Sequence, residues 1–171
     1  MLIKSYTIEQ NINLLKNNIC LFFGDNYGLK DDIKRKIRNL NSKSEITILN
    51  QEEIIKKDIL NIELNNLSLF KKKKIYFIEN TNDKILDKIL EVTKFVKEDK
   101  IYLFAAALDK KSKIRNLFEK SKEFAVVACY EDNEMTLRRI IQEKLKNFDG
   151  LNPYNINLIL ESCNMNRMKL N

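Results

Sequence analysis

The stretch LSLFKKKKIYFIEN, residues 67–80, contains three segments of different chemistry. Residues 75–78 are rich in β-branched and aromatic side chains, which is typical of a strand buried on both faces within a parallel sheet. Residues 71–74 are an unbroken run of lysines, and an apolar group that includes Leu69 and Phe70 precedes them. This Leu-Phe pair is either part of the core or an anchor presented to a partner.

Strand patterns like the one at residues 75–78 recur along the chain and alternate with helical patterns. The other four are residues 19–23, 46–49, 101–108 and 124–129. Amphipathic helices are predicted between them, with the clearest at residues 29–40, 83–96 and 110–120. This alternation predicts an α/β fold, with a mostly parallel five-stranded sheet and helices on both of its faces.

The pattern changes after Tyr130, where no further strand is predicted. Residues 135–148 are amphipathic, and Asn152-Pro153 is a strong start signal for a second helix. A third helix is expected from Asn166. We therefore expect an α/β domain at residues 1–131 and a helical domain at residues 132–171 that looks cut short, and whose helices should exchange their amide hydrogens fastest.

The composition of the chain narrows its function classes. There is no histidine, which excludes Ser-His-Asp and Cys-His catalysis and His-ligated zinc. Cys20, Cys129 and Cys163 lie far apart without CxxC spacing, so we expect no metal site and a reducing environment. No apolar run approaches the roughly 18 residues of a membrane span. These features favour a soluble, cytoplasmic protein without a membrane contact.

The formal net charge of +7 favours an acidic partner, either a polyanion or an acidic protein. Lys71, Lys72, Lys73 and Lys74 are either a solvated run or an electrostatic contact with such a partner. The acidic cluster Glu131, Asp132 and Glu134 is more simply a solvated linker that caps the following helix than a metal site.

The turn after residues 19–23 stands where a phosphate-binding loop would lie. That loop has the pattern G-x-x-x-x-G-K-[ST]. With Gly24 as the first glycine and Lys30 as the lysine, Leu29 replaces the second glycine and Asp31 replaces the hydroxyl residue that binds Mg²⁺. Gly24, Gly28 and Lys30 therefore form a degenerate loop that we do not expect to bind nucleotide.

The other positions that contact nucleotide in a nucleotide-binding fold are also altered. The strand at residues 75–78 leads into Glu79-Asn80 instead of an Asp-Glu pair, and residues 101–108 end in alanines and leucine. Asp31 and Asp32 place carboxylates near a helix N-terminus, where they repel phosphate. We expect a fold that was retained after its ATPase chemistry was lost, with no cofactor.

Taken in order, several features resemble the delta subunit of the bacterial DNA polymerase III clamp loader, over essentially the whole chain. They are the degenerate loop at residues 24–30, Ser68-Leu69-Phe70 before a strand, the strand at residues 101–108, the segment KKSKIRNLF at residues 110–118, Asn152-Pro153, and the closing residues 163–171. The resemblance rests on the order and spacing of these features more than on any single motif.

This resemblance implies an AAA+-like (P-loop NTPase-like) α/β domain followed by an incomplete helical lid domain. It implies a non-catalytic subunit that binds and opens the sliding clamp (beta subunit) during DNA replication. Its other partners would be further clamp-loader subunits, with DNA contacted indirectly or weakly. The family belongs to the DNA-directed DNA polymerase holoenzyme, a nucleotidyltransferase, but no intrinsic ATPase or polymerase activity is implied.

The resemblance also assigns a clamp-binding element. In the family, a short helix presents a Leu-Phe pair, which maps onto Leu69 and Phe70, with Leu67 and Ser68 alongside. Two alternatives stay open: a P-loop-type ATPase with an atypical loop, and a basic nucleic-acid-binding module. Against the latter, aromatic residues are not interleaved with the lysines as a base-stacking platform requires.

Overall fold

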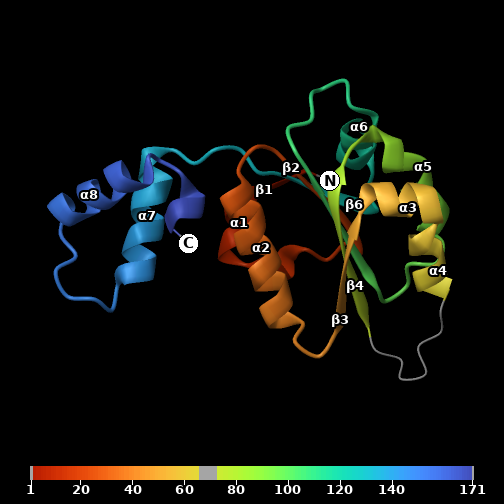
Figure 1. Ribbon diagram of the computed structural model, residues 1–171, viewed down its shortest axis with the longest axis horizontal. Coiled ribbons are helices and arrows are strands. Elements are labelled where there is room, and N and C mark those ends of the chain that lie inside the picture. Colours follow the sequence, from red (N-terminus) through yellow and green to blue (C-terminus); the bar gives the residue numbers. More distant parts are fainter. Residues whose placement is uncertain (1, 66–72, 171) are drawn as a thin grey trace.

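The structure, a computed structural model, describes residues 2–65 and 73–170. Six parallel strands form one sheet in the order β1-β6-β2-β5-β4-β3 (Figure 1). They are β1 (Leu2–Lys4), β2 (Ile19–Phe23), β3 (Glu45–Asn50), β4 (Lys74–Thr81), β5 (Lys100–Ala105) and β6 (Phe124–Ala128). The α/β fold class is thereby confirmed.

The sheet has six strands where the sequence predicted five, because the edge strand β1 was missed. It is only three residues long, and Ile3 alone is buried, so neither a hydrophobic run nor an alternating pattern marks it. Leu2 to Lys4 pair with Val126 to Ala128 of β6. The prediction was therefore correct for the interior of the sheet and wrong at its edge.

Helices cover both faces of the sheet, as Figure 1 shows. On one face lie α1 (Ser5–Gln10) and α2 (Tyr27–Leu40), whose apolar side chains pack on β2, β4, β5 and β6. On the other face lie α3 (Gln51–Lys57), α4 (Ile59–Asn65), α5 (Leu86–Val92) and α6 (Lys113–Lys120). Successive strand residues point to opposite faces, so Phe22 joins the first core while Leu21 and Phe23 join the second.

Capping residues fix several helix ends. Asn26 caps α2 by accepting a hydrogen bond from the backbone N–H of Leu29 (2.9 Å). The predicted helix from Asp83 is instead a 3₁₀ turn, η2 (Asp83–Ile85), followed by the short α5, so Phe95 lies beyond the helix and is exposed. Leu40, the last residue of α2, is also exposed.

The C-terminal helices are α7 (Glu134–Leu145) and α8 (Pro153–Cys163), followed by the 3₁₀ turn η3 (Arg167–Leu170). The predicted start at Asn152-Pro153 is confirmed, because Asn152 accepts a hydrogen bond from the Asn155 N–H (2.9 Å). α7 and α8 share a small core of their own, and η3 lies between α7 and the helices α1 and α2, which cover one face of the sheet (Figure 1). No helix in the described part of the chain is long and apolar enough to cross a membrane.

Candidate functional site

The loop between β2 and α2 is fixed by its own backbone. Gly24 has a φ of +128°, and a Cβ there would lie 2.2 Å from the carbonyl oxygen of Cys129, so only glycine fits. The Gly24 N–H donates to the Ala106 carbonyl (3.1 Å), and the Asn26 N–H donates to the Cys129 carbonyl (3.1 Å). The loop is therefore tied to the segments that follow β5 and β6.

Lys30, the candidate phosphate-binding lysine, is buried and already bonded within the protein. Its Nζ donates to the backbone carbonyls of Gly24 (2.8 Å) and Ala105 (2.8 Å), and it lies 4.0 Å from the centre of the Tyr27 ring. Burial lowers the pKa of this ammonium from its usual value. Its donors are directed at groups of the protein, so a phosphate would have to displace two hydrogen bonds to reach it.

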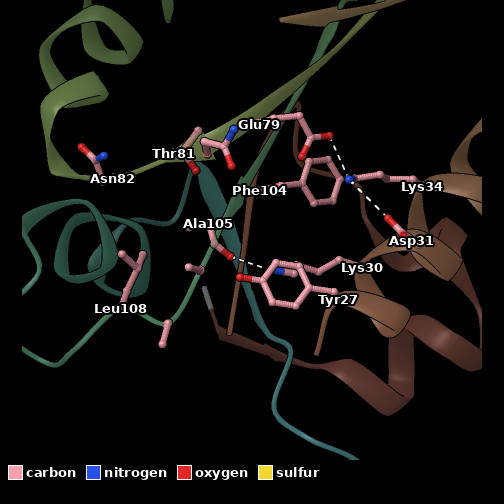
Figure 2. Close-up of a pocket in the computed structure, with 13 residues that line it drawn as sticks. Tyr27, Lys30, Asp31, Lys34, Glu79, Thr81, Asn82, Phe104, Ala105 and Leu108 are labelled. Atoms are coloured by element: carbon pink, nitrogen blue, oxygen red, sulfur yellow. Dashed lines mark hydrogen bonds and ion pairs between the residues drawn. The ribbon is translucent and has the colours of Figure 1, made fainter. Parts of the chain in front are cut away.

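A cavity of about 260 Å³ lies beside Lys30, at the carboxyl ends of β4 and β5 (Figure 2). This edge of a parallel sheet is where α/β proteins commonly bind ligands. Here Lys34 extends across it, with its Nζ 2.8 Å from Glu79 and 3.5 Å from Asp31, over the ring of Phe104. Glu79, which occupies the position of the acidic pair of a nucleotide-binding fold, thus forms an ion pair with Lys34.

A buried arginine joins the C-terminal helices to the α/β part. Arg167, at the start of η3, is 6% exposed and contacts three carboxylates. Its Nε donates to Asp32 of α2 (2.8 Å), its Nη1 to Asp132 (3.2 Å), and its Nη2 to Glu9 of α1. We call Arg167, Glu9, Asp32 and Asp132 the arginine cluster. It connects three segments of the α/β side to η3.

Electrostatics keep this guanidinium charged despite its burial. Burial opposes the charge, but the hydrogen bond to Glu9 and the charges of Glu9 and Asp132 outweigh that effect and raise the pKa of Arg167. Asn26 supports the cluster, because its side-chain amide donates to Asp132 (2.7 Å). The residue that caps α2 therefore also orients a carboxylate of the cluster.

Close packing at Gly28 adds a second link between η3 and α2. A Cβ on Gly28 would lie 2.9 Å from the backbone nitrogen of Met168 and 3.1 Å from the carbonyl carbon of Arg167. Glycine at this position lets η3 lie directly on the first turn of α2. The cavity left beside it, about 280 Å³, is lined by the carboxylates of Asp25, Glu131 and Asp132.

Two expectations from the sequence need correction. Asp31 and Asp32 are not at the N-terminus of α2, because the helix begins at Tyr27 and places them in its second turn. Asp132 is not part of a solvated linker, since its side chain is 7% exposed and binds Arg167. Asn133 provides the cap of α7 instead, by accepting from the Thr136 N–H (2.9 Å).

These contacts do not suit a nucleotide with Mg²⁺. The lysine is bonded to carbonyls, the N-terminal turn of α2 is covered by η3, and the adjacent cavity carries carboxylates that repel phosphate. The arrangement of Gly24, Gly28 and Lys30 fits a structural turn.

The predicted clamp-binding residues Leu67, Ser68, Leu69 and Phe70 lie outside the described residues, as do Lys71 and Lys72. Lys73 is half-buried. Lys74 is buried, and its Nζ contacts the Glu63 carbonyl (3.2 Å) and carboxylate (3.5 Å). The Lys74 side chain is therefore directed into the protein, toward α4.

The strand order and the loop between β2 and α2 invite comparison with solved nucleotide-binding folds. The Bacillus subtilis DNA clamp loader delta protein matches 84% of this chain and 47% of its own, with a TM-score of 0.60 and 12% identity. The fold is AAA+-like. Drosophila ORC, in a structure bound to DNA, matches 96% of this chain and 57% of its own, with a TM-score of 0.55 and 12% identity.

Rhizobiales Trip13 has the same kind of likeness, over 92% of this chain and 65% of its own, with a TM-score of 0.53 and 12% identity. The chain spans about half the length of the first two of these proteins. A scan against protein-family models finds no match, and a search of curated proteins finds no similar sequence. The likeness at 12% identity is one of fold.

Proposed function

We propose that the chain is a non-catalytic subunit of a DNA-replication assembly, and that it binds and opens a sliding clamp. Residues 1–131 would form its AAA+-like domain and residues 132–171 part of a lid. One observation carries the non-catalytic part of the proposal: Lys30 is bonded to the Gly24 and Ala105 carbonyls within an AAA+-like fold. Such a chain would retain the fold without ATPase activity and would act by binding other proteins through its surface.

The clamp-loader part rests on two independent supports. One is the order of sequence features that resembles the delta subunit. The other is the structural likeness to the Bacillus subtilis DNA clamp loader delta protein. Sliding clamp and further clamp-loader subunits are therefore the proposed partners, and contact with DNA would be indirect or weak.

The proposed docking element is Leu67, Ser68, Leu69 and Phe70, in the connection between α4 and β4. On α4, which precedes this connection in the chain, Ile62 is exposed. An aromatic side chain that fills a pocket of a partner can carry several kcal/mol of binding free energy. Lys71, Lys72 and Lys73 would add screened attraction to an acidic rim of the clamp.

A titration of the chain with its cognate sliding clamp tests this proposal. Phe70→Ala should weaken clamp binding by about 2 kcal/mol, roughly thirtyfold, while the melting temperature stays nearly unchanged. Phe95→Ala is the matched control, because Phe95 is exposed on the α/β part, and it should leave clamp binding unchanged.

The core phenylalanine Phe118 gives the opposite reference. It is fully buried, so Phe118→Ala should lower the free energy of unfolding by about 3–5 kcal/mol. If Phe70→Ala behaves like Phe118→Ala in thermal melts, Phe70 belongs to the core and the docking element is misassigned. If wild-type protein shows no saturable binding to the clamp, the proposed function itself is wrong.

A further inference from the structure

A second surface is lined by several basic side chains. The groove between α2 and α7 encloses about 610 Å³ (its helices are labelled in Figure 1). Arg35 and Lys36 approach it from α2, and Arg139 and Lys144 approach it from α7. Arg38, one turn further along α2, extends the same row toward the neighbouring cavity.

We propose that this groove binds the sugar–phosphate backbone of duplex nucleic acid without reading its sequence. The net charge of +7 supplies long-range attraction, and the two helices bring cations from distant parts of the sequence to one site. The proposal does not depend on the docking of a sliding clamp, because it uses other residues.

The cations of the groove are held in place and yet open to solvent. Arg35 pairs with Asp32, and Arg139 pairs with Glu143 at 3.0 Å, but their side chains remain 51% and 41% exposed. Lys36 donates to the Glu9 carbonyl, and Lys144 donates to the Leu170 carbonyl (3.0 Å). The guanidinium groups of Arg35 and Arg139 keep further N–H donors, and exposed ion pairs of this kind are weak enough for a phosphate to compete.

The acidic residues of the groove are already engaged. Glu9 and Asp32 are directed at the buried Arg167, and Glu143 is paired with Arg139. The described lining contains five basic side chains (Arg35, Lys36, Arg139, Lys144 and Arg167) and three acidic ones, so its formal charge is +2. A phosphate on this surface would meet a modest excess of cations over carboxylates.

The lining favours nucleic acid over an acidic protein. Cores of protein–protein interfaces are rich in apolar and aromatic side chains and poor in charges. Among the described residues that line this groove, only Ile140 is apolar, and it is buried. A polar, positively charged lining is what interfaces with nucleic acid have.

The same lining favours a duplex backbone over a single strand. Single-strand binding sites stack bases on aromatic side chains, and no aromatic side chain lines this groove in the part of the chain that the structure describes. The polar Gln10 and Asn39 can hydrogen-bond to phosphate or sugar oxygens, which positions a backbone without specifying bases. Affinity should thus depend on salt and be the same for unrelated sequences.

The test measures the anisotropy of short fluorescein-labelled duplexes of two unrelated sequences, between about 50 and 200 mM salt. Arg35→Ala/Lys36→Ala and Arg139→Ala/Lys144→Ala should each weaken binding about tenfold or more for both sequences. Each should also reduce the slope of log affinity against log salt by about 2, because each variant leaves two phosphates without a cation. Thermal melts verify that the variants are folded.

Lys110→Ala/Lys111→Ala is the control, because both lysines are exposed in the segment before α6 and the variant removes the same charge. Its binding should stay within about twofold of wild type. An equal loss of affinity in the control, or no saturable binding of duplex at the lowest salt, would overturn the proposal. The proposal would also be overturned if polyglutamate or single-stranded DNA bound more tightly than duplex and lost affinity in the two groove variants. Clamp binding should survive both groove variants, which separates this proposal from the proposed function.

Discussion

Replacing Arg167 by alanine should loosen the contact between the C-terminal helices and the α/β part. The side chain of Arg167 contacts Glu9, Asp32 and Asp132, whose own side chains are 10%, 14% and 7% exposed. Without the guanidinium, these carboxylates would repel one another in a partly dehydrated site.

The magnitude follows from the burial of the pairs. Breaking a buried ion pair by removing one partner costs about 3–5 kcal/mol. Asp32 keeps its contact with Arg35, and Asp132 keeps the amide of Asn26, so the lower end of this range applies. About 3 kcal/mol corresponds to a roughly hundredfold increase in the population of the detached state.

Native-state hydrogen exchange locates the effect. Amides of α7 and α8 should exchange roughly a hundredfold faster in Arg167→Ala, because their own core is small and detachment exposes it. Amides of β2 and β5, in the centre of the sheet, should keep their wild-type rates. The comparison is made under conditions in which exchange reports the equilibrium of opening.

Arg139→Ala is the matched control, since this arginine lies on α7 and makes an exposed pair with Glu143. Such a pair contributes about 0–1 kcal/mol, so exchange should change less than about fivefold. Neutralising the cluster in Arg167→Ala by Asp32→Asn and Asp132→Asn should restore part of the protection. Equal exchange of α7 in the Arg167 and Arg139 variants would refute the reasoning.

Three further predictions concern the loop, its lysine and a helix cap. Gly28→Ala should destabilise the protein, although alanine normally favours a helix over glycine by about 1 kcal/mol, because its Cβ would meet the backbone of Met168; thermal melts measure the sign. Lys30→Met should lower the free energy of unfolding by about 1–3 kcal/mol. Calorimetry with Mg-ATP should show no saturable binding by wild type or variant. ATP turnover by wild type that disappears in the variant would contradict the prediction that the chain does not bind nucleotide. Asp83→Asn should be destabilising near neutral pH, because the carboxylate accepts from the N–H groups of Lys113 and Ile114 and from Ser112. Burial would raise the pKa of Asp83, but these hydrogen bonds lower it on balance. The stabilisation that Asp83 gives to the folded state is therefore present above its unfolded pKa of about 4 and is lost as the pH falls through the folded pKa. Denaturation at several pH values should show the stabilities of wild type and variant converging in acid, with the exposed Asp87→Asn as control.

The interior of the fold could be predicted because its strands are buried on both faces. Residues 75–78 and 101–104 are continuous apolar runs, and in an α/β chain such a short run indicates a strand that is buried on both faces of the sheet. Helix starts with a local signal, such as Asn152-Pro153, were also predictable. The edge strand β1 and the end of α5 before Phe95 depend on tertiary packing, which a local pattern does not report.

The site was predictable only where the chemistry is local. The sequence indicated that Leu29 and Asp31 disrupt a phosphate loop, since the motif is contiguous. It contained no signal for the arginine cluster, because Arg167 is separated from Asp32 by 135 positions and from Glu9 by 158. Asp83 was likewise interpreted as the start of its own helix, while its carboxylate caps α6 about 30 residues later.

The arginine cluster has a consequence for how this chain can move. In a nucleotide-dependent protein, a ligand that binds two states with different affinity shifts the population between them. Here one guanidinium is shared by three carboxylates of the same chain, which leaves an excess of negative charge, and phosphate would enter beside Asp25, Glu131 and Asp132. The orientation of α7 and α8 is therefore set by the chain itself. A partner that changes this orientation must supply the roughly 3 kcal/mol that hold Arg167, which reduces its apparent affinity about a hundredfold. Clamp or nucleic-acid binding that tightens by this factor in Arg167→Ala would identify the partner that works against the cluster.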